Sequence, residues 1–228
     1  NMGNLFSKFF GTVGVIDSIR VTLVMSFWST LIASMLGIFL GLVLEQTKFL
    51  GKKLVVRVNR TLMGAPPVVI GLLKYMLLRK KGPFGALRWV FTIKGMVAAQ
   101  VLIITPIVCG MVYSDAVRSA PSIRAFARTM GDDRQQTARL LLREMKNEIY
   151  FAVVSGYGRS ISEVGAVFLV GGNIKNSTRT MTTAISTLKG AGDYYEGVFL
   201  GVILMLLAFA VQTLAEHFRQ EETPDENL

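Results

Sequence analysis

The chain has 228 residues, 51% of them hydrophobic, with a mean hydropathy of +0.47 and a formal net charge of +10. With one cysteine (Cys109) and one histidine (His217), it can form neither an intrachain disulfide nor the usual His/Cys metal sites, so we expect no cofactor. Its basic residues are spread over all polar segments without interleaved aromatic residues, which argues against a nucleic-acid partner and for contact with lipid headgroups.

Residues 1–20 are the first predicted unit, a short segment lying in the membrane interface. Apolar residues from Phe6 to Ile16 recur at spacings that place them near one face of a helix. A signal peptide is the alternative, but Lys8 alone provides a positive region and no A-x-A-like cleavage site follows. We therefore expect the next apolar segment to be a retained membrane helix.

Three segments are free of charged residues over about the length that spans a bilayer. They are residues 21–44, 95–114 and 197–215. The first contains Gly37 and Gly41, a G-x-x-x-G pattern that favours close helix packing. Each segment is predicted to be one membrane helix.

Two further segments are apolar but interrupted. Residues 62–78 contain Pro66, Pro67 and Lys74, and residues 149–172 contain Arg159 and Glu163. A central charge costs about 3 kcal/mol on insertion scales, which a dozen apolar side chains can offset. The sequence therefore predicts an all-α membrane protein with about five transmembrane helices in a single permease domain, residues 21–215.

The distribution of Lys and Arg does not decide the orientation. With the N-terminus outside, the inner loops hold 13 basic residues and the outer loops hold ten. The tail, residues 216–228, is rich in Asp and Glu and is expected to be solvated. The orientation of the chain in the membrane therefore has to be inferred from other features of the sequence.

The longest polar stretch, residues 115–148, holds seven Lys or Arg against five Asp or Glu. Its charges require water or a soluble partner. Gly131 and the two aspartates after it can begin a helix, in which Leu140, Leu141 and Met145 form an apolar stripe. A short amphipathic helix is predicted in the second half of this loop.

This loop resembles the cytoplasmic signature of membrane subunits of ATP-binding-cassette (ABC) importers, E-A-A, three residues, Gly, then an apolar run ending in L-P. Ala127, Gly131 and Leu141 fall on signature positions, whereas Ala125 and Phe126 replace the Glu and the first Ala, and Arg143-Glu144 replaces Leu-Pro. The resemblance implies a cytoplasmic coupling helix that docks on a separate ATPase. The residues it assigns to this coupling are Ala127, Arg128, Gly131, Asp132, Asp133 and Arg134.

Residues 156–166 and 171–174 are similar to the fourth core helix and following loop of molybdate, tungstate and sulfate permeases. Residues 63–73 and 82–85 look most like the tungstate branch of that family. The resemblance implies a type I ABC importer fold, a homodimer, two ATPase subunits and an extracytoplasmic substrate-binding protein. It also implies the cytoplasmic (inner) membrane, with the N-terminus outside and the C-terminus in the cytoplasm.

Candidate residues for the translocation path or gate combine helix breaks, an intramembrane charge pair and a Gly/Asn/Ser/Thr-rich turn. They are Pro66, Pro67, Arg159, Ser162, Glu163, Asn173, Thr178, Arg179 and Thr182. Spaced i, i+4, Arg159 and Glu163 share a helix face, where they form either a structural pair or a positive element beside an anion path. The turn residues either offer donors to an oxyanion or form an ordinary exposed turn.

The sequence contains no P-loop and no nucleophile–base arrangement, so we expect no catalytic site and place ATP hydrolysis in a partner chain. The leading hypothesis is a permease subunit that imports tungstate or molybdate. The alternatives are a sulfate-specific ABC permease, an ATP-independent anion transporter or channel, and a structural membrane scaffold. Transport without ATP, or tolerance to loss of the charged pair, would indicate the last two.

Overall fold

The computed structural model describes residues 14–220 except 130, 132 and 133, and for 134–135, 214–215 and 217–220 it describes the backbone alone. The regular structure in this part of the chain is helical. The helices are α2 (Val15–Gln46), α3 (Lys52–Met63), α4 (Pro67–Leu78), η1 (Gly85–Leu87), α5 (Ile93–Thr129), α6 (Arg134–Glu144), α7 (Lys146–Ile161), α8 (Gly165–Gly171), α9 (Met181–Ala191) and α10 (Tyr194–Gln220). The all-α prediction is confirmed.

Three described helices are long and apolar enough to cross a membrane, namely α2, α5 and the Tyr194–Thr213 part of α10. The full helices α2, α5 and α10 contain the three charge-free segments of the sequence. At 1.5 Å per residue, the 37 residues of α5 extend about 55 Å, well beyond a hydrocarbon core of about 30 Å. The end of α5 therefore projects from the membrane, carrying Asp115–Thr129 as helix where the sequence suggested a loop.

The other two predicted spans are not single helices, and that part of the prediction is wrong. Residues 62–78 include the break between α3 and α4, which are bent by 102° and count at most as one broken span. Pro66 is extended (φ −62°, ψ 122°) and Pro67 begins α4, because proline has no N–H to continue the helix ladder. Residues 149–172 are divided between α7 and α8 by a turn at 162–164.

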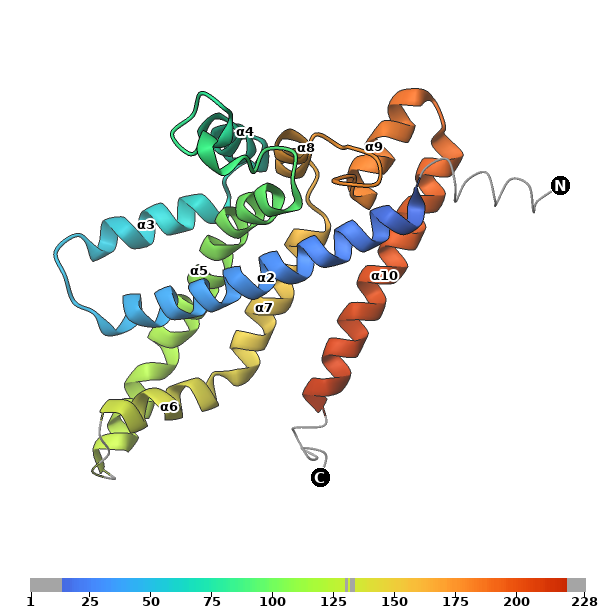
Figure 1. The fold of residues 1–228 in the computed structure, drawn as a ribbon. Helices are drawn as coiled ribbons and strands as arrows, with labels where there is room; N and C mark the ends of the chain where they lie inside the picture. Colours follow the sequence, from blue (N-terminus) through green and yellow to red (C-terminus); the bar gives the residue numbers. More distant parts are fainter. Residues whose placement is uncertain (1–13, 130, 132–133, 221–228) are drawn as a thin grey trace.

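Shorter helices run beside the three long ones between the two ends of the molecule (Figure 1). Helices α2, α5 and α10 run in one direction, and α3 and α7 return in the other. The short helices α4, α8 and α9 gather at the end where α2 begins, and α6 lies at the opposite end, where α10 finishes.

The packing of α2 on α5 forms the centre of the bundle. A Cβ added at Gly37 would lie 2.7 Å from the Val108 Cβ, and one at Gly41 would lie 3.0 Å from the carbonyl oxygen of Cys109. Ala33, next to these glycines, is fully buried. The G-x-x-x-G pattern therefore marks a close helix contact within one chain.

Candidate functional site

The turn between α7 and α8 holds the charged pair that the sequence singled out. Arg159 Nη1 lies 2.9 Å from Glu163 Oε2, with side-chain exposures of 33% and 2%. Glu163 lies beyond the last residue of α7, so the pair closes the end of that helix across the turn. One member is buried, and the other reaches the surface of the chain.

Glu163 also connects three helices. Its Oε1 accepts a hydrogen bond from the Ala166 N–H at 3.1 Å, at the start of α8. Its backbone carbonyl accepts a hydrogen bond from Thr182 Oγ1 of α9 at 2.8 Å. Ser162, by contrast, is exposed and donates to the local carbonyl of Gly158. The structure thus brings Arg159, Glu163 and Thr182 together and leaves the Ser162 hydroxyl at the surface.

The Gly/Asn/Ser/Thr-rich turn after α8 is held by its own side chains. Thr178 is buried, donates to the carbonyl of Gly171 and accepts from the Ile174 N–H. Arg179 Nε donates to Asn173 Oδ1 at 3.2 Å, and Asn173 Nδ2 donates to the Thr187 hydroxyl of α9. These hydrogen bonds stabilise the turn and hold the half-buried Arg179 in it.

Helix α4 packs closely on α8, which places the Pro66–Pro67 break near the turn of Glu163. A Cβ at Gly71 would lie 2.6 Å from the Ala166 Cα, and one at Gly165 would lie 2.6 Å from a methyl group of Val68. The two helix breaks therefore lie at the same end of the bundle (Figure 1). Irregular backbone at membrane depth is stable only where protein or a watery cavity covers it.

A polar seam between α2, α5 and α7 was missed in the sequence. The Ser29 and Ser160 hydroxyls are hydrogen-bonded at 2.8 Å, and Gln100 Nε2 donates to the Ser160 carbonyl at 3.3 Å. All three side chains are fully buried. The hydroxyls of α2 recur every three or four residues from Ser18 to Ser34, a signal that could have located the seam.

The described residues of the predicted coupling segment lie at the end of α5, in the turn that follows and at the start of α6. Ala127 is buried and Arg128 exposed near the end of α5, and Gly131 has a φ of 72° that favours glycine. The backbone of Arg134 begins α6, whereas Asp132 and Asp133 lie outside the described residues.

Helix α6 is fixed by an apolar contact and the α5 extension by an ion pair. Leu141 and Met145 are buried in one cluster with Ala116 and Ala120 of α5. Arg124 Nη2 lies 2.5 Å from Glu45 Oε2, and this pair joins the extension of α5 to the end of α2. These contacts join α6 to α5, and the projecting part of α5 to the end of α2.

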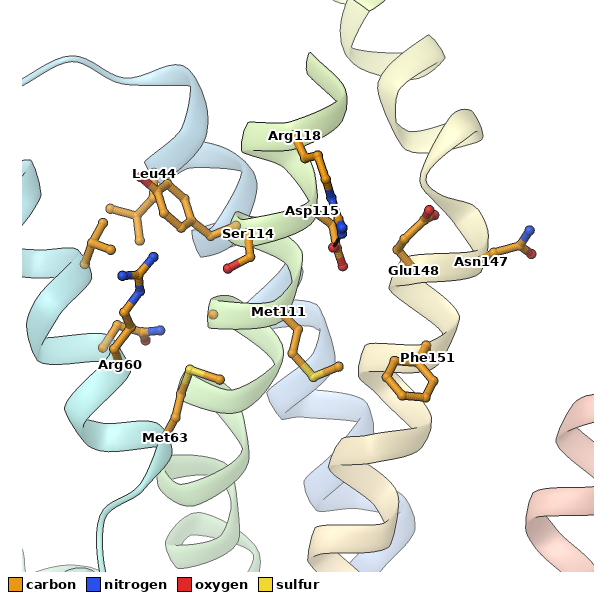
Figure 2. Close-up of a pocket in the computed structure, with 14 residues that line it drawn as sticks. Leu44, Arg60, Met63, Met111, Ser114, Asp115, Arg118, Asn147, Glu148 and Phe151 are labelled. Carbon is orange, nitrogen blue, oxygen red and sulfur yellow. Dashed lines mark hydrogen bonds and ion pairs between the residues drawn. The ribbon is translucent and has the colours of Figure 1, made fainter. Parts of the chain in front are cut away.

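A cavity of about 710 Å³ lies between α3, α5 and α7, toward the end of the molecule that carries α6 (Figures 1 and 2). Figure 2 shows Arg60 of α3 on one flank, Glu148 of α7 on the other, and Met111 and Ser114 of α5 between them. Arg118 pairs with Asp115 in its wall. None of these residues was a candidate in the sequence analysis, because the charged ones were interpreted as ordinary membrane-flanking groups. Within the described residues, no group of three or more His, Cys, Asp or Glu is placed to hold a metal ion.

The protein family described as "Binding-protein-dependent transport system inner membrane component" matches residues 33–221. The chain belongs to this family. It is 36% identical over 193 residues to the tungstate uptake system permease protein TupB of Peptoclostridium acidaminophilum, with 85% of each chain covered. It is 32% identical over 225 residues to the TupB of Campylobacter jejuni, with 95% of this chain and 90% of the relative covered.

Among solved structures, a bacterial ABC transporter involved in the import of the acidic polysaccharide alginate matches with a TM-score of 0.72 at 19% identity. The match covers 92% of this chain and 80% of that one, and it shows the shared fold. The resemblance inferred from the glycine-centred loop and the later motif is thus confirmed. As an inner-membrane component of such a system, the chain is a multi-pass permease subunit that works with an ATPase and a substrate-binding protein.

Proposed function

We propose that this chain imports tungstate, or the near-isosteric molybdate, as a homodimer with two ATPase subunits and an extracytoplasmic binding protein. The observation that carries the proposal is the projecting unit of α5, α6 and α7, fixed by the buried Leu141 and Met145. A chain without its own nucleotide site needs such a connection to a separate motor. The tungstate assignment rests on the two TupB relatives.

In this mechanism α6 is the coupling helix, with Ala127 to Arg134 near its docking face. Closure of the ATPase pair pushes α6, and the 37-residue α5 carries the movement into the membrane. The Arg124–Glu45 pair passes the same movement to α2. Access to the path then alternates between the two sides.

The orientation follows from the place of α6. With α6 in the cytoplasm, α2 begins outside and α10 ends in the cytoplasm (Figure 1). The acidic tail, residues 216–228, is then expected to be cytoplasmic as well. The permease domain is then 21–215, extended by Val15–Arg20, which the structure shows as part of α2. Helices α4, α8 and α9 face the binding protein, and the outward face of α10 is free for lipid or the second copy.

At the outer end, the turn of Glu163 and the two prolines of the α3–α4 break form the gate region. Glu163 neutralises much of the charge of Arg159 and fixes its position, so Arg159 presents a weak positive potential to a passing dianion. Arg179 provides a second cation of similar character. Weak attraction suits a path, because a strongly held anion would not leave.

A measurement of coupled ATP hydrolysis tests the proposal. The chain is assembled with its ATPase in lipid nanodiscs, and phosphate release is followed with the binding protein empty, loaded with tungstate, or loaded with sulfate. Stimulation by the tungstate-loaded protein, with a smaller effect for sulfate, is expected. Equal rates in all three conditions would contradict the proposal, and preference for sulfate would indicate a sulfate permease.

A further inference from the structure

Helix α3 carries a row of cations that the translocation mechanism described so far does not use. Lys53, Arg57 and Arg60 follow one another at spacings of four and three residues, so they share one helix face over about 10 Å of its length. We call these three residues the cation stripe. All three are exposed, and none has a carboxylate within salt-bridge distance among the residues that the structure describes.

The remaining faces of α3 show which way the stripe points. One face packs on α5, where Asn59 Nδ2 donates to the Pro106 carbonyl at 3.1 Å and Met63 fills the space beside Gly110. Another face carries Leu54 and Val58, which are exposed by 62% and 48%. By helical spacing this apolar face lies about 110° around the helix from the stripe, and it suits contact with lipid.

A charged row on a membrane-crossing helix is stable only where water reaches it. The structure provides that space in two adjoining cavities. The cavity of Figure 2, of about 710 Å³, and a second of about 750 Å³ share Val56, Arg60 and Tyr113 in their walls. The second continues along α3 to the turn between α2 and α3, at Lys48.

The charge of the walls changes along this route. The inner cavity contains Asp115 and Glu148 as well as Arg60 and Arg118, so its formal charges balance. The described lining of the outer cavity contains five cations and no carboxylate; they are Lys48, Lys52, Lys53, Arg57 and Arg60. Lys52 is already engaged by the carbonyls of Glu45 and Thr47, which leaves four to face a ligand.

We propose that the cation stripe and the two adjoining cavities form the inward release route of the transported oxyanion, with a transient dianion site between Arg57, Arg60 and Lys53. This inference rests on the proposed function. A tetrahedral dianion leaves the neutral inner cavity for the cationic outer one, so the potential favours release toward the α6 end. Exposed cations on flexible side chains hold the ion weakly, which permits the next step into the cytoplasm.

Cysteine accessibility tests the direction of the stripe. The chain has a single cysteine, the buried Cys109, so the unaltered protein serves as the blank. Arg57→Cys, Arg60→Cys and the control Val58→Cys are assembled with the ATPase in liposomes of uncharged lipid and treated with a sulfonate-bearing methanethiosulfonate. The variants at 57 and 60 should react about tenfold faster than the one at 58, and tungstate should slow them. Equal rates at all three positions, or no protection by tungstate, would overturn the proposal.

The phosphate of an anionic lipid headgroup is also a tetrahedral anion and could occupy the same site. A second experiment distinguishes a lipid headgroup from the transported oxyanion. The liposomes are prepared with phosphatidylglycerol and without tungstate. Protection by tungstate in uncharged lipid supports the release route. Protection by phosphatidylglycerol alone, with none from tungstate, shows a headgroup site and contradicts it.

Measurement of tungstate transport tests whether the cation stripe contributes to function. Arg57→Gln/Arg60→Gln should lower the initial rate of tungstate uptake about tenfold, the size of one charge-assisted hydrogen bond, while ATPase assembly is retained. The control Lys80→Gln/Lys81→Gln removes the same charge from the exposed loop after α4 and should transport normally. If the unaltered assembly transports tungstate and the two double variants behave alike, the release route is wrong and the proposed function stands. If the unaltered assembly does not transport tungstate, both fail.

Discussion

Replacement of Glu163 is the sharpest test of how the gate region is built. Glu163→Ala removes the ion pair with Arg159 and the hydrogen bond from the Ala166 N–H. Hydrogen bonds to charged groups contribute about 1.5–3 kcal/mol each, and the 33% exposure of Arg159 reduces its share. We therefore expect a loss of about 3 kcal/mol in the free energy of unfolding.

For a chain of this length, 1 kcal/mol corresponds to about 2–4 °C in the melting temperature, so Glu163→Ala should lower it by roughly 6–12 °C. Two matched variants divide the effect. Glu163→Gln keeps an acceptor for the Ala166 N–H, so it should lower the free energy of unfolding by about half as much as Glu163→Ala. Ser162→Ala, one residue away, removes a hydroxyl bonded to local carbonyls and should lose less than about 1 kcal/mol.

The assay is thermal unfolding of the purified chain in detergent, followed by fluorescence-detected size exclusion. A melting temperature of Glu163→Ala within about 2 °C of the unaltered protein would contradict a stabilising role of the carboxylate. It would mean that the turn of Glu163 is held by the surrounding helices and not by its carboxylate.

Three further substitutions test other contacts. Gly71→Val places side-chain atoms against the α8 backbone and should destabilise the chain by more than about 3 kcal/mol in the same assay, whereas Gly158→Ala, with open space around it, should be neutral or slightly stabilising. Gly131→Val forces a β-branched residue to a φ of 72° and should weaken pull-down of the ATPase, whereas Gly131→Asn should not; equal recovery with both would count against a fixed turn before α6. Arg124→Glu should lower coupled ATPase activity, and the exchange with Glu45→Arg should restore it, because the pair spans two helices; failure of the exchange would show that the charges act separately.

The long apolar helices were readable in the sequence because insertion depends on summed hydrophobicity, which is a local property. The break at Pro66 was visible for the same reason, since proline removes a donor wherever it stands. Its angle of 102° was not visible, because the contact of Gly71 with Ala166 of α8 helps to set it.

The turn at 162–164 had no local signal. Residues 149–172 are apolar enough for one helix, and the interruption is stabilised by contacts of Glu163 with Arg159, Ala166 and Thr182. The last of these is 19 residues further along the chain. Tertiary hydrogen bonds thus override the helical preference of the segment, and a single sequence does not reveal them.

The extension of α5 was missed for a different reason. Charged residues from Asp115 onward were interpreted as a loop, but the helix continues through Pro121 to Thr129. Buried Ala116, Ala120 and Ala127 give this part an apolar face for α6 and the neighbouring helices. The cation stripe was likewise present in the sequence, but only the packing of α3 on α5 distinguishes its face from a solvated one.

In the proposed function, this chain carries tungstate into the cell only when a separate ATPase drives it. The most direct measurement is the initial rate of tungstate uptake into liposomes that contain the permease, its ATPase and the loaded binding protein. Uptake should require ATP and stop when the ATPase is omitted or inactivated. Uptake at the same rate without ATP or without the ATPase would contradict the account and indicate an ATP-independent carrier or channel.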